Sequence, residues 1–466
     1  MRSPAVVVVL VALLGQHSSI TALANGRPPL TNGVHFSPAD SHSLYVASTF
    51  GLLVSHDDGC SFRWLCEQSI GYGGTFDPKY RVAVDGTIFA TTFTGLRVSR
   101  DRGCSFSTAT SDKPLGDPGR IADRWIDAID VGPTGEIWVA TADSGKPNNV
   151  YRSTDNGMTF APRGMLSQAI WWKSLTIAPS RAQRIYATGY QVAGTASGGG
   201  QMPPTAHFEI TDDDGLTWVE SPLAGVQYGS TPLVYVVGVD RTNPDVVLMS
   251  SSRANPPNGD RLYRSTDGGV TWREVLATTG ALLDVASAPT GNVLVATLGG
   301  GSFASADGGA TFSAMATAPQ LACVGQRDDG RIYGCAANWE PDNKAVAVST
   351  DGKTWDKVFR FVELAGPVEC PAGTAQHDTC AALWPSVQQQ FGATGPTCGV
   401  SPPPATPPSA PAPPTDPAPA TTTPAHAGCC NASPDPSGLF GALAALGGAR
   451  LRSRNRRARR RSPGAR

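Results

Sequence analysis

The 466-residue sequence predicts an all-β protein, and three observations lead to that prediction. One motif, clearest at Ser265–Trp272 (STDGGVTW), occurs seven times. The copies begin 44, 54, 58, 54, 40 and 44 residues apart, which is the period of a four-stranded propeller blade with loops of variable length. Short runs rich in β-branched and aromatic residues lie between Gly, Pro and Asn, without a helical period of useful length. We therefore expect a seven-bladed β-propeller.

Each residue type in the motif has a physical role that requires no ligand. The Asp carboxylate accepts hydrogen bonds from backbone N–H groups of the turn that it opens, and the Gly adopts positive φ without steric cost. The Thr restarts an extended strand, and the aromatic side chain is buried between neighbouring sheets. The seven structural aspartates are Asp57, Asp101, Asp155, Asp213, Asp267, Asp307 and Asp351.

The same order of strands surrounds each copy of the motif. In the first unit, β-rich runs at 34–36, 44–47 and 52–54 precede the motif, and a fourth run at 62–64 follows it. We assign residues 25–365 to the propeller, because stacked blades bury a continuous core that one blade could not form.

These repeats resemble the Asp-box, or BNR, repeats of sialidases, sortilin-type receptors, xyloglucanases and photosystem II assembly-factor propellers. The resemblance implies that the motif forms the turn between the third and fourth strands, away from the functional face. It implies a fold and not a function. Sialidases of this fold carry an early Phe/Tyr-Arg-Ile-Pro sequence, and the nearest match here, Gly119–Ala122 (GRIA), lacks the proline. The sequence therefore does not favour a sialidase.

Candidate ligand-binding residues lie on the opposite face, which the turns between second and third strands share with the crossovers between blades. Loops rich in Trp, Tyr and Gly gather there, and aromatic rings stack on sugars or grip peptide side chains. An alternative is that Trp125, Trp171 and Trp172 fill the gaps where blades meet. Trp339 lies in the polar loop 338–342 and is the better surface candidate. The full set is Trp125, Trp171, Trp172, Tyr190, Tyr228, Arg253 and Trp339.

Two functions remain open: a non-catalytic module that binds a protein or glycan, and an extracellular glycoside hydrolase on the same scaffold. A hydrolase needs two facing carboxylates, which Asp123, Asp127 and Asp342 could supply. The sequence contains no H-E-x-x-H, phosphate-loop or G-x-S-x-G motif and no histidine at ligand spacing. We therefore expect no cofactor and no metal site.

Charge and the N-terminus predict an exported protein. The 37 basic and 38 acidic residues nearly balance, so we expect no nucleic-acid partner, and we expect a monomer. Residues 1–24 have the form of a signal peptide, with Arg2, the apolar run Ala5–Leu14 and a small-residue cleavage site at Ala22–Ala24.

Ten cysteines in an exported chain should mostly be paired. Cys323 and Cys335 are equally far from Asp329, so a hairpin that turns there brings them within disulfide reach. Cys370, Cys380 and Cys398 form a second cluster. The partners of Cys60, Cys66 and Cys104 cannot be read from the sequence.

Three segments follow the propeller. Residues 366–398 form a small disulfide-bearing cap, in which the spacing of Leu383, Trp384, Val387 and Phe391 predicts an amphipathic helix that begins near Pro385. Residues 399–428 form a disordered linker rich in Pro, Ala and Thr.

The tail, residues 429–466, contains Cys429, Cys430, a short apolar segment at 439–446 and an arginine cluster. It resembles the MYXO-CTERM sorting tail of exported myxobacterial proteins, which implies processing at the cysteines and anchoring at the cell surface or outer membrane, or later release. The apolar segment is shorter than the roughly 20 residues of a spanning helix. The alternatives are a disordered basic tail or a nucleic-acid-binding arm.

Overall fold

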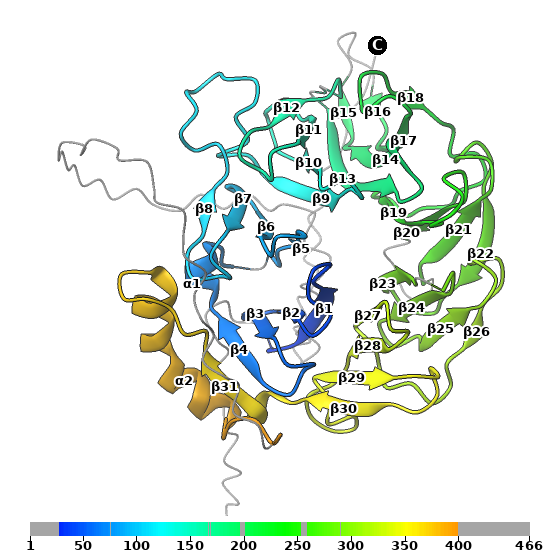
Figure 1. Ribbon diagram of the computed structural model, residues 1–466. Helices are drawn as coiled ribbons and strands as arrows, with labels where there is room; N and C mark the ends of the chain where they lie inside the picture. The colour runs from blue at the N-terminus through cyan, green and yellow to red at the C-terminus, as the bar shows by residue number, and fades with distance from the viewer. Residues whose placement is uncertain are drawn as a thin grey trace, which may run out of the picture. The chain divides into compact units, whose positions relative to one another are not determined.

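The computed structural model describes residues 28–398, apart from 75, 166, 168, 196–200, 253–258 and 289. The predicted signal peptide, linker and tail, with Cys429 and Cys430, lie outside the described residues, as does Arg253. The described residues form seven antiparallel four-stranded blades around a common centre, which confirms the predicted propeller (Figure 1).

The first four blades follow the chain in order. Blade 1 contains β1 (Thr31–Phe36), β2 (Leu44–Ser48), β3 (Gly51–Ser55) and β4 (Phe62–Leu65). Blade 2 contains β5 (Tyr80–Val82), β6 (Ile88–Thr92), β7 (Gly95–Ser99) and β8 (Ser107–Thr108). Blade 3 contains β9 (Ile126–Val131), β10 (Ile137–Thr141), β11 (Val150–Ser153) and β12 (Ala161–Pro162). Blade 4 contains β13 (Ile170–Ala178), β14 (Arg181–Gln191), β17 (Thr205–Thr211) and β18 (Val219–Glu220), and a small hairpin of β15 (Gly194–Thr195) and β16 (Gln201–Met202) extends from it.

The remaining blades repeat the pattern. Blade 5 contains β19 (Val234–Val239), β20 (Val247–Ser251), β21 (Arg261–Ser265) and β22 (Arg273–Ala277). Blade 6 contains β23 (Leu282–Ser287), β24 (Val293–Thr297), β25 (Ser302–Ser305) and β26 (Ser313–Ala314). Blade 7 contains β27 (Cys323–Gln326), β28 (Ile332–Cys335), β29 (Val346–Ser349) and β30 (Asp356–Phe359).

The second strand of each blade carries most of the core. In six blades it is buried at every position, as in β10 (IWVAT) and β24 (VLVAT). Each such strand is covered on both sides by neighbouring blades, so its sequence reads as a continuous apolar run and not as an alternating one. The first strands line the centre of the ring (Figure 1).

The repeated motif forms the turn between the third and fourth strands, which we call the repeat turn. In blade 5, Ser265 Oγ donates to Asp267 Oδ1 at 2.7 Å and accepts from the Gly269 N–H at 2.8 Å. Thr271 donates to Asp267 twice, through its N–H at 2.9 Å and its hydroxyl at 2.6 Å. These hydrogen bonds, that of the Thr271 hydroxyl above all, lower the pKa of Asp267 to about 2.

The aromatic residue that ends the motif packs on the preceding blade. Trp272 lies 5.1 Å from Phe208 of blade 4, and Trp218 Nε1 donates to the carbonyl oxygen of Arg163 in blade 3 at 2.7 Å. Each repeat turn therefore fastens two consecutive blades.

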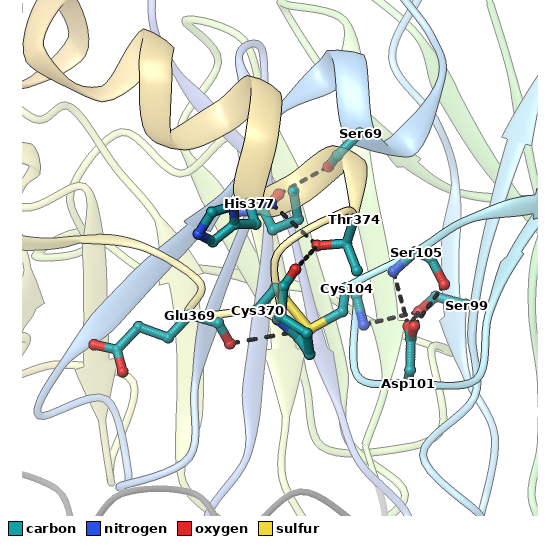
Figure 2. Close-up of a disulfide and its surroundings, with 12 residues drawn as sticks. Ser69, Ser99, Asp101, Cys104, Ser105, Glu369, Cys370, Thr374 and His377 are labelled. Carbon is teal, nitrogen blue, oxygen red and sulfur yellow. Dashed lines mark hydrogen bonds between the residues drawn. A yellow bond between two sulfur atoms is a disulfide. The ribbon is translucent and has the colours of Figure 1, made fainter. Parts of the chain in front are cut away.

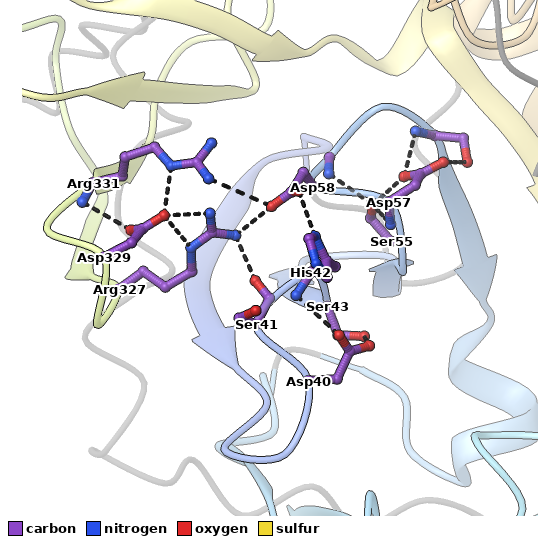
Figure 3. A network of polar contacts seen from close by, with 12 residues as sticks. Asp40, Ser41, His42, Ser43, Ser55, Asp57, Asp58, Arg327, Asp329 and Arg331 are labelled. Atoms are coloured by element: carbon purple, nitrogen blue, oxygen red, sulfur yellow. Dashed lines mark hydrogen bonds and ion pairs between the residues drawn. The ribbon is translucent and has the colours of Figure 1, made fainter.

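The last and first blades meet through a buried arginine. Arg327, in the turn between β27 and β28, donates to Asp58 in the repeat turn of blade 1 and to the Ser41 carbonyl oxygen, both at 2.6 Å (Figure 3). Its guanidinium also contacts Asp329 at 2.6 Å, and it is 5% exposed. The turns after the first and third strands therefore lie on the same face of the ring, which we call the repeat-turn face. The turns between second and third strands and the crossovers form the opposite face, which we call the loop face.

The segment 361–398 binds the outer edge of blade 1, and we call it the clasp. Its strand β31 (Leu364–Pro367) pairs parallel to β4 as a fifth strand. Phe361 and Phe391 pack on Phe50 at 5.1 and 5.0 Å. The fully buried Gln376 donates to the Trp64 carbonyl oxygen at 2.7 Å. The clasp thus continues the chain past blade 7 onto blade 1.

Disulfides join the clasp to two blades. Cys380 is bonded to Cys66 in blade 1, and Cys370 is bonded to Cys104 in the repeat turn of blade 2, beside Asp101 and Ser105 (Figure 2). A third disulfide joins Cys323 to Cys335, directly opposite each other in β27 and β28, as the hairpin symmetry predicts. Three disulfides indicate an exported protein.

The helix of the clasp, α2 (Ala381–Phe391), begins four residues before the predicted start at Pro385. A π-helical turn, Gln376–Cys380, leads directly into it and supplies the preceding turn, so Pro385 lies inside the helix. The sequence pattern did not indicate α1 (Glu67–Ile70), a single turn after β4. At 4 and 11 residues, the α-helices of the described residues have neither the length nor the apolar composition needed to cross a bilayer.

Candidate functional site

Large hydrophobic side chains are exposed on both faces but are arranged differently. On the repeat-turn face, Met158, Leu216 and Val270 occupy the same position of three separate repeat turns, and isolated exposed residues of this kind are ordinary. On the loop face, exposed residues occur in the turns between second and third strands, as at Phe93, which is 46% exposed. Phe93 is in contact with other aromatic rings.

A row of five aromatic residues crosses blades 2, 3 and 4 on the loop face, and we call it the aromatic track. Phe76 lies 4.5 Å from Phe93, and Phe93 lies 4.9 Å from Trp125. Trp125 lies 5.8 Å from Trp171, which lies 5.7 Å from Tyr190. Trp125 and Tyr190 are buried, Phe76 and Trp171 are partly exposed and Phe93 is exposed. The buried members therefore support the exposed ones from below.

A cavity of about 310 Å³ adjoins the Trp171 end of the track. Blade 3 contributes Ser144 and Gly145 to its lining, and blade 4 contributes Gln191 at the end of β14, Val192 in the loop after it and Met202 in β16. The lining contains both polar and apolar side chains, so the cavity can accept a molecule that has both hydroxyl groups and an apolar face.

Ion pairs fix the crossover that carries Trp125. The Arg124 guanidinium contacts Asp143 at 2.5 Å, and the other oxygen of Asp143 accepts the Trp125 N–H at 2.9 Å. Asp143 belongs to the loop between β10 and β11, so one carboxylate joins the crossover to that loop. This geometry sets the position of the indole.

A charged cluster lies beneath the track. Lys173 Nζ stands 4.6 Å from the Trp125 ring centroid and also contacts Asp127, which is 6% exposed in β9. Lys79 contacts the same carboxylate at 3.4 Å and donates to the Asp127 carbonyl oxygen at 2.6 Å. Asp127 is therefore held between two ammonium groups, one of which also binds the indole face.

The sequence-predicted site residues separate into three groups. Trp125, Trp171 and Tyr190 come together in the track. Trp172 is 1% exposed and lies in the core between blades 3 and 4. It therefore fills the gap between two blades, which was the alternative to ligand contact. Tyr228 and Trp339 are exposed at 39% and 46%, and Trp339 packs edge-on against Phe361 of the clasp at 5.8 Å. Neither has a ring contact with the track among the described residues.

Phe93 was missed by the sequence reasoning, whereas the crossover stretch 71–76, which ends at Phe76, is expected on this face although Phe76 was not chosen as a site residue. Phe76 lies in the crossover from blade 1 to blade 2, four residues before β5, and Phe93 lies in the turn between β6 and β7. The corresponding turn of blade 1 holds Phe50, which is 2% exposed because the clasp covers it. A Thr-Phe pair occurs in this turn of both blades and could have pointed to Phe93 from the sequence alone. The sequence does not show whether each Phe is exposed, because that depends on which segment packs over it.

The carboxylates considered for hydrolysis lie in different settings. Asp127 is paired with two lysines, and the mostly exposed Asp123 contacts Arg120 at 2.7 Å. Asp342 accepts the Ala337 N–H at 3.2 Å within the loop of blade 7. Asp342 is thus in a different blade from Asp127, and its oxygen is already used by the backbone.

A second cavity, of about 280 Å³, lies on the repeat-turn face between the first hairpins of blades 5 and 6. Its lining includes Asp240, Arg241, Ser287 and Gly291 and contains no aromatic ring. We take the cavity beside Trp171 as the candidate site because it continues the aromatic track.

Comparison with known proteins finds no matching family model. The curated xyloglucanase Xgh74A of Acetivibrio thermocellus is 29% identical over 158 residues, which cover 31% of this chain and 16% of that protein. The match therefore spans less than a fifth of the relative's length.

Several solved structures resemble this chain at low sequence identity. A GH74 xyloglucanase from Xanthomonas campestris has a TM-score of 0.39 and 16% identity, with 70% of this chain and 66% of that chain covered. PorZ, a surface component of the type-IX secretion system of Porphyromonas gingivalis, has a TM-score of 0.46 and 16% identity, with 66% and 45% covered. YCF48 from Cyanidioschyzon merolae has a TM-score of 0.43 and 12% identity, with 66% and 92% covered. The chain is a seven-bladed β-propeller with neighbours among GH74 and YCF48 propellers.

Proposed function

We propose that this protein is an exported, cell-surface propeller that binds a neutral glycan through the aromatic track, without catalysis of its own. The observation that carries the proposal is a contiguous row of rings from Phe76 to Tyr190 that includes exposed Phe93 and borders a cavity at Trp171. Pyranose rings present apolar C–H faces that pack on aromatic rings, while their hydroxyl groups need polar partners. Ser144 and Gln191 can supply such partners in the cavity.

The charges near the track favour a neutral glycan over an acidic one. Lys173 and Lys79 are both in contact with Asp127, and Arg124 is paired with Asp143. An anionic sugar would have to compete with these carboxylates for the same cations. The partial relationship to a xyloglucanase also supports a glucan-type polysaccharide.

Two finer assignments belong to the same proposal. The hydrogen-bonded repeat turns, exemplified by Asp267 with Thr271, support their assignment as Asp-box (BNR) repeats. We also propose that the tail 429–466 acts as a MYXO-CTERM-type sorting signal, with anchoring through Cys429 or Cys430.

Binding of the purified protein to xyloglucan and other neutral β-glucans, measured by affinity electrophoresis and calorimetry, tests the proposal. We expect Trp171→Ala and Phe93→Ala each to weaken binding about tenfold, the effect of removing an aromatic contact worth about 1.4 kcal/mol. Trp339→Ala is the matched control, because Trp339 is an equally exposed aromatic of the loop face outside the track. An equal loss of glycan affinity in all three variants would contradict the proposal. So would the absence of binding to any of these glycans, and a peptide would then be the remaining ligand for the loop face.

The alternative is a glycan-cleaving enzyme on this scaffold, which the 158-residue match to a xyloglucanase supports. Release of reducing ends from the same polysaccharides separates the two functions. The enzyme would be established if the wild-type protein releases reducing ends and one of the variants Asp123→Asn, Asp127→Asn or Asp342→Asn does not, while that variant still binds the polysaccharide.

A further inference from the structure

Blade 4 brings an imidazole and two carboxylates together at its outer edge, and we propose that His207, Glu209 and Glu220 bind a zinc ion. His207 and Glu209 are two residues apart in β17, so their side chains lie on the same face of the sheet. Glu220, in β18, is the direct register partner of Glu209. One ligand atom from each of the three side chains lies within 4.8 Å of the other two.

The neighbours of these residues fix their orientation. Ala206, Phe208 and Ile210 alternate with them along β17 and belong to the core shared with blade 5. His207 and Glu209 therefore point to the other side of the sheet. The His207 side chain is 14% exposed, and its Nδ1 is 2.9 Å from Glu220 Oε1, so the ring is already held beside a carboxylate.

The two carboxylates lack a fixed positive partner. Within the described ranges, no Lys or Arg forms an ion pair with Glu209 or Glu220, and His207 is the one side chain that contacts Glu220 in this way. Like charges that face each other across paired strands destabilise a sheet. Since β18 is only two residues long, half of its ladder consists of this repulsive pair.

The repeats supply an internal comparison. Blade 5 has Arg261 where blade 4 has His207 and Tyr263 where blade 4 has Glu209, and Glu274 corresponds to Glu220. Arg261 contacts Glu274 at 3.5 Å, so that blade balances a single acid with a fixed cation. In the other five blades the corresponding register pair contains no acid: Leu53 with Trp64, Arg97 with Thr108, Tyr151 with Pro162, Phe303 with Ala314, and Ala347 with Lys357. Where blade 5 has the fixed positive charge of Arg261, blade 4 thus has three side chains that can coordinate a metal ion.

The donor set determines the ion. One imidazole nitrogen with two carboxylate oxygens suits Zn²⁺, whereas Ca²⁺ and Mg²⁺ take oxygen ligands. Three protein ligands leave a coordination position for water. The bound ion would join β18 to β17, as Arg261 does in blade 5. An i, i+2 pair on one strand that a residue of the next strand completes does not match the ligand-spacing motifs by which metal sites are found in a sequence, so no metal site was expected here.

Calorimetry and thermal unfolding of the full-length, EDTA-treated protein test this site, with ZnCl₂, CaCl₂ and MgCl₂ added separately. We expect one Zn²⁺ per chain and a rise in Tm with zinc alone. His207→Ala should lower zinc affinity at least tenfold and abolish the rise in Tm.

His207→Arg copies blade 5 and separates ligand loss from misfolding. This variant should bind no zinc at the site and should have, without metal, the Tm of the zinc-loaded wild type. His377→Ala is the control, because His377 forms an exposed pair with Asp378 elsewhere in the chain. Zinc binding that survives both His207 variants would overturn the proposal. So would a rise in Tm on acidification to pH 6 with no response to zinc, because a proton would then relieve the repulsion.

Discussion

Cys66 and Cys380 are 314 residues apart in the sequence, and a disulfide holds their Cα atoms 5.7 Å apart at the outer edge of blade 1. Blades 1 and 7 are built from opposite ends of the propeller and share no strand among the described residues. Closure of the ring therefore depends on packing, on Arg327 with Asp58, and on the clasp.

Replacing both Cys66 and Cys380 by Ser should destabilise the protein strongly. Because the Cys104–Cys370 disulfide remains in this variant, the Cys66–Cys380 bond closes a loop of roughly 50 residues in the unfolded chain. Such a cross-link restricts the unfolded chain by about 4 kcal/mol, whereas a loop of about a dozen residues contributes about 3 kcal/mol. The Cys323→Ser/Cys335→Ser variant, which opens a loop of 12 residues, is thus the matched comparison. Urea unfolding without reductant measures both. A larger loss in the Cys323 and Cys335 variant would contradict the role of the clasp in closure.

Cys60 and Cys398 should form a fourth disulfide after export. Cys398 Sγ lies 3.2 Å from the Cys60 carbonyl oxygen. A hydrogen bond with the Cys398 side chain, above all, raises the pKa of the Cys60 thiol to about 12. Oxidation removes two protons and two electrons, which the disulfide of a thiol oxidase in the exporting compartment accepts. Peptide mapping by mass spectrometry without reductant should find the cross-linked pair. Two alkylated thiols in exported protein would show the prediction to be wrong.

Asp267→Asn should cost stability at neutral pH and little at pH 2. The pKa of Asp267 in the folded protein, about 2, is below the usual value of about 3.9 in an unfolded chain. Stability from this carboxylate is therefore fully present above about pH 4 and is lost as pH falls toward 2. Tm measured from pH 7 to pH 2 should show the variant and the wild type converging. Asp112→Asn, at an exposed loop position, should follow the wild type throughout.

Asp127→Ala should destabilise the protein by about 3 kcal/mol, because it leaves the buried Lys173 without its counter-charge. The double variant Asp127→Ala/Lys173→Met removes this buried pair, leaves the more exposed Lys79, and should recover most of that loss. Chemical unfolding of the single and double variants gives the coupling between them. Equal destabilisation of both variants would show that Asp127 acts through packing alone.

The fold was predictable because the information is local and repeated. Asp, Gly and Thr at fixed offsets mark each turn between third and fourth strands, and seven copies at blade spacing leave little freedom in the architecture. The hairpin disulfide of Cys323 with Cys335 was predictable for the same reason, since both cysteines lie on adjacent strands. The start of α2 was not, because the π-helical turn before it has no distinct sequence pattern.

The candidate site was only partly predictable, because its residues meet through tertiary contacts. Trp125 and Trp171 were assigned to the correct face from the order of strands, but their ring contact depends on the way blades 3 and 4 pack. Phe93 and Phe50 occupy similar turns and differ in exposure only because the clasp covers one of them. The pairing of Cys66 and Cys104 with the clasp likewise involves residues from opposite ends of the chain.

Cys398 is the point at which the described chain leaves the propeller, and it lies beside the repeat turn of blade 1. If the tail anchors the protein as proposed, the pull acts from the repeat-turn face, opposite to the aromatic track. Copies held side by side on a surface would thus turn their tracks toward the surrounding medium, and a polymer could lie across several of them at once. Weak contacts at single propellers would then add up along the polymer. The density of the protein on the surface would therefore determine the overall avidity for the polymer as much as the affinity of one site does.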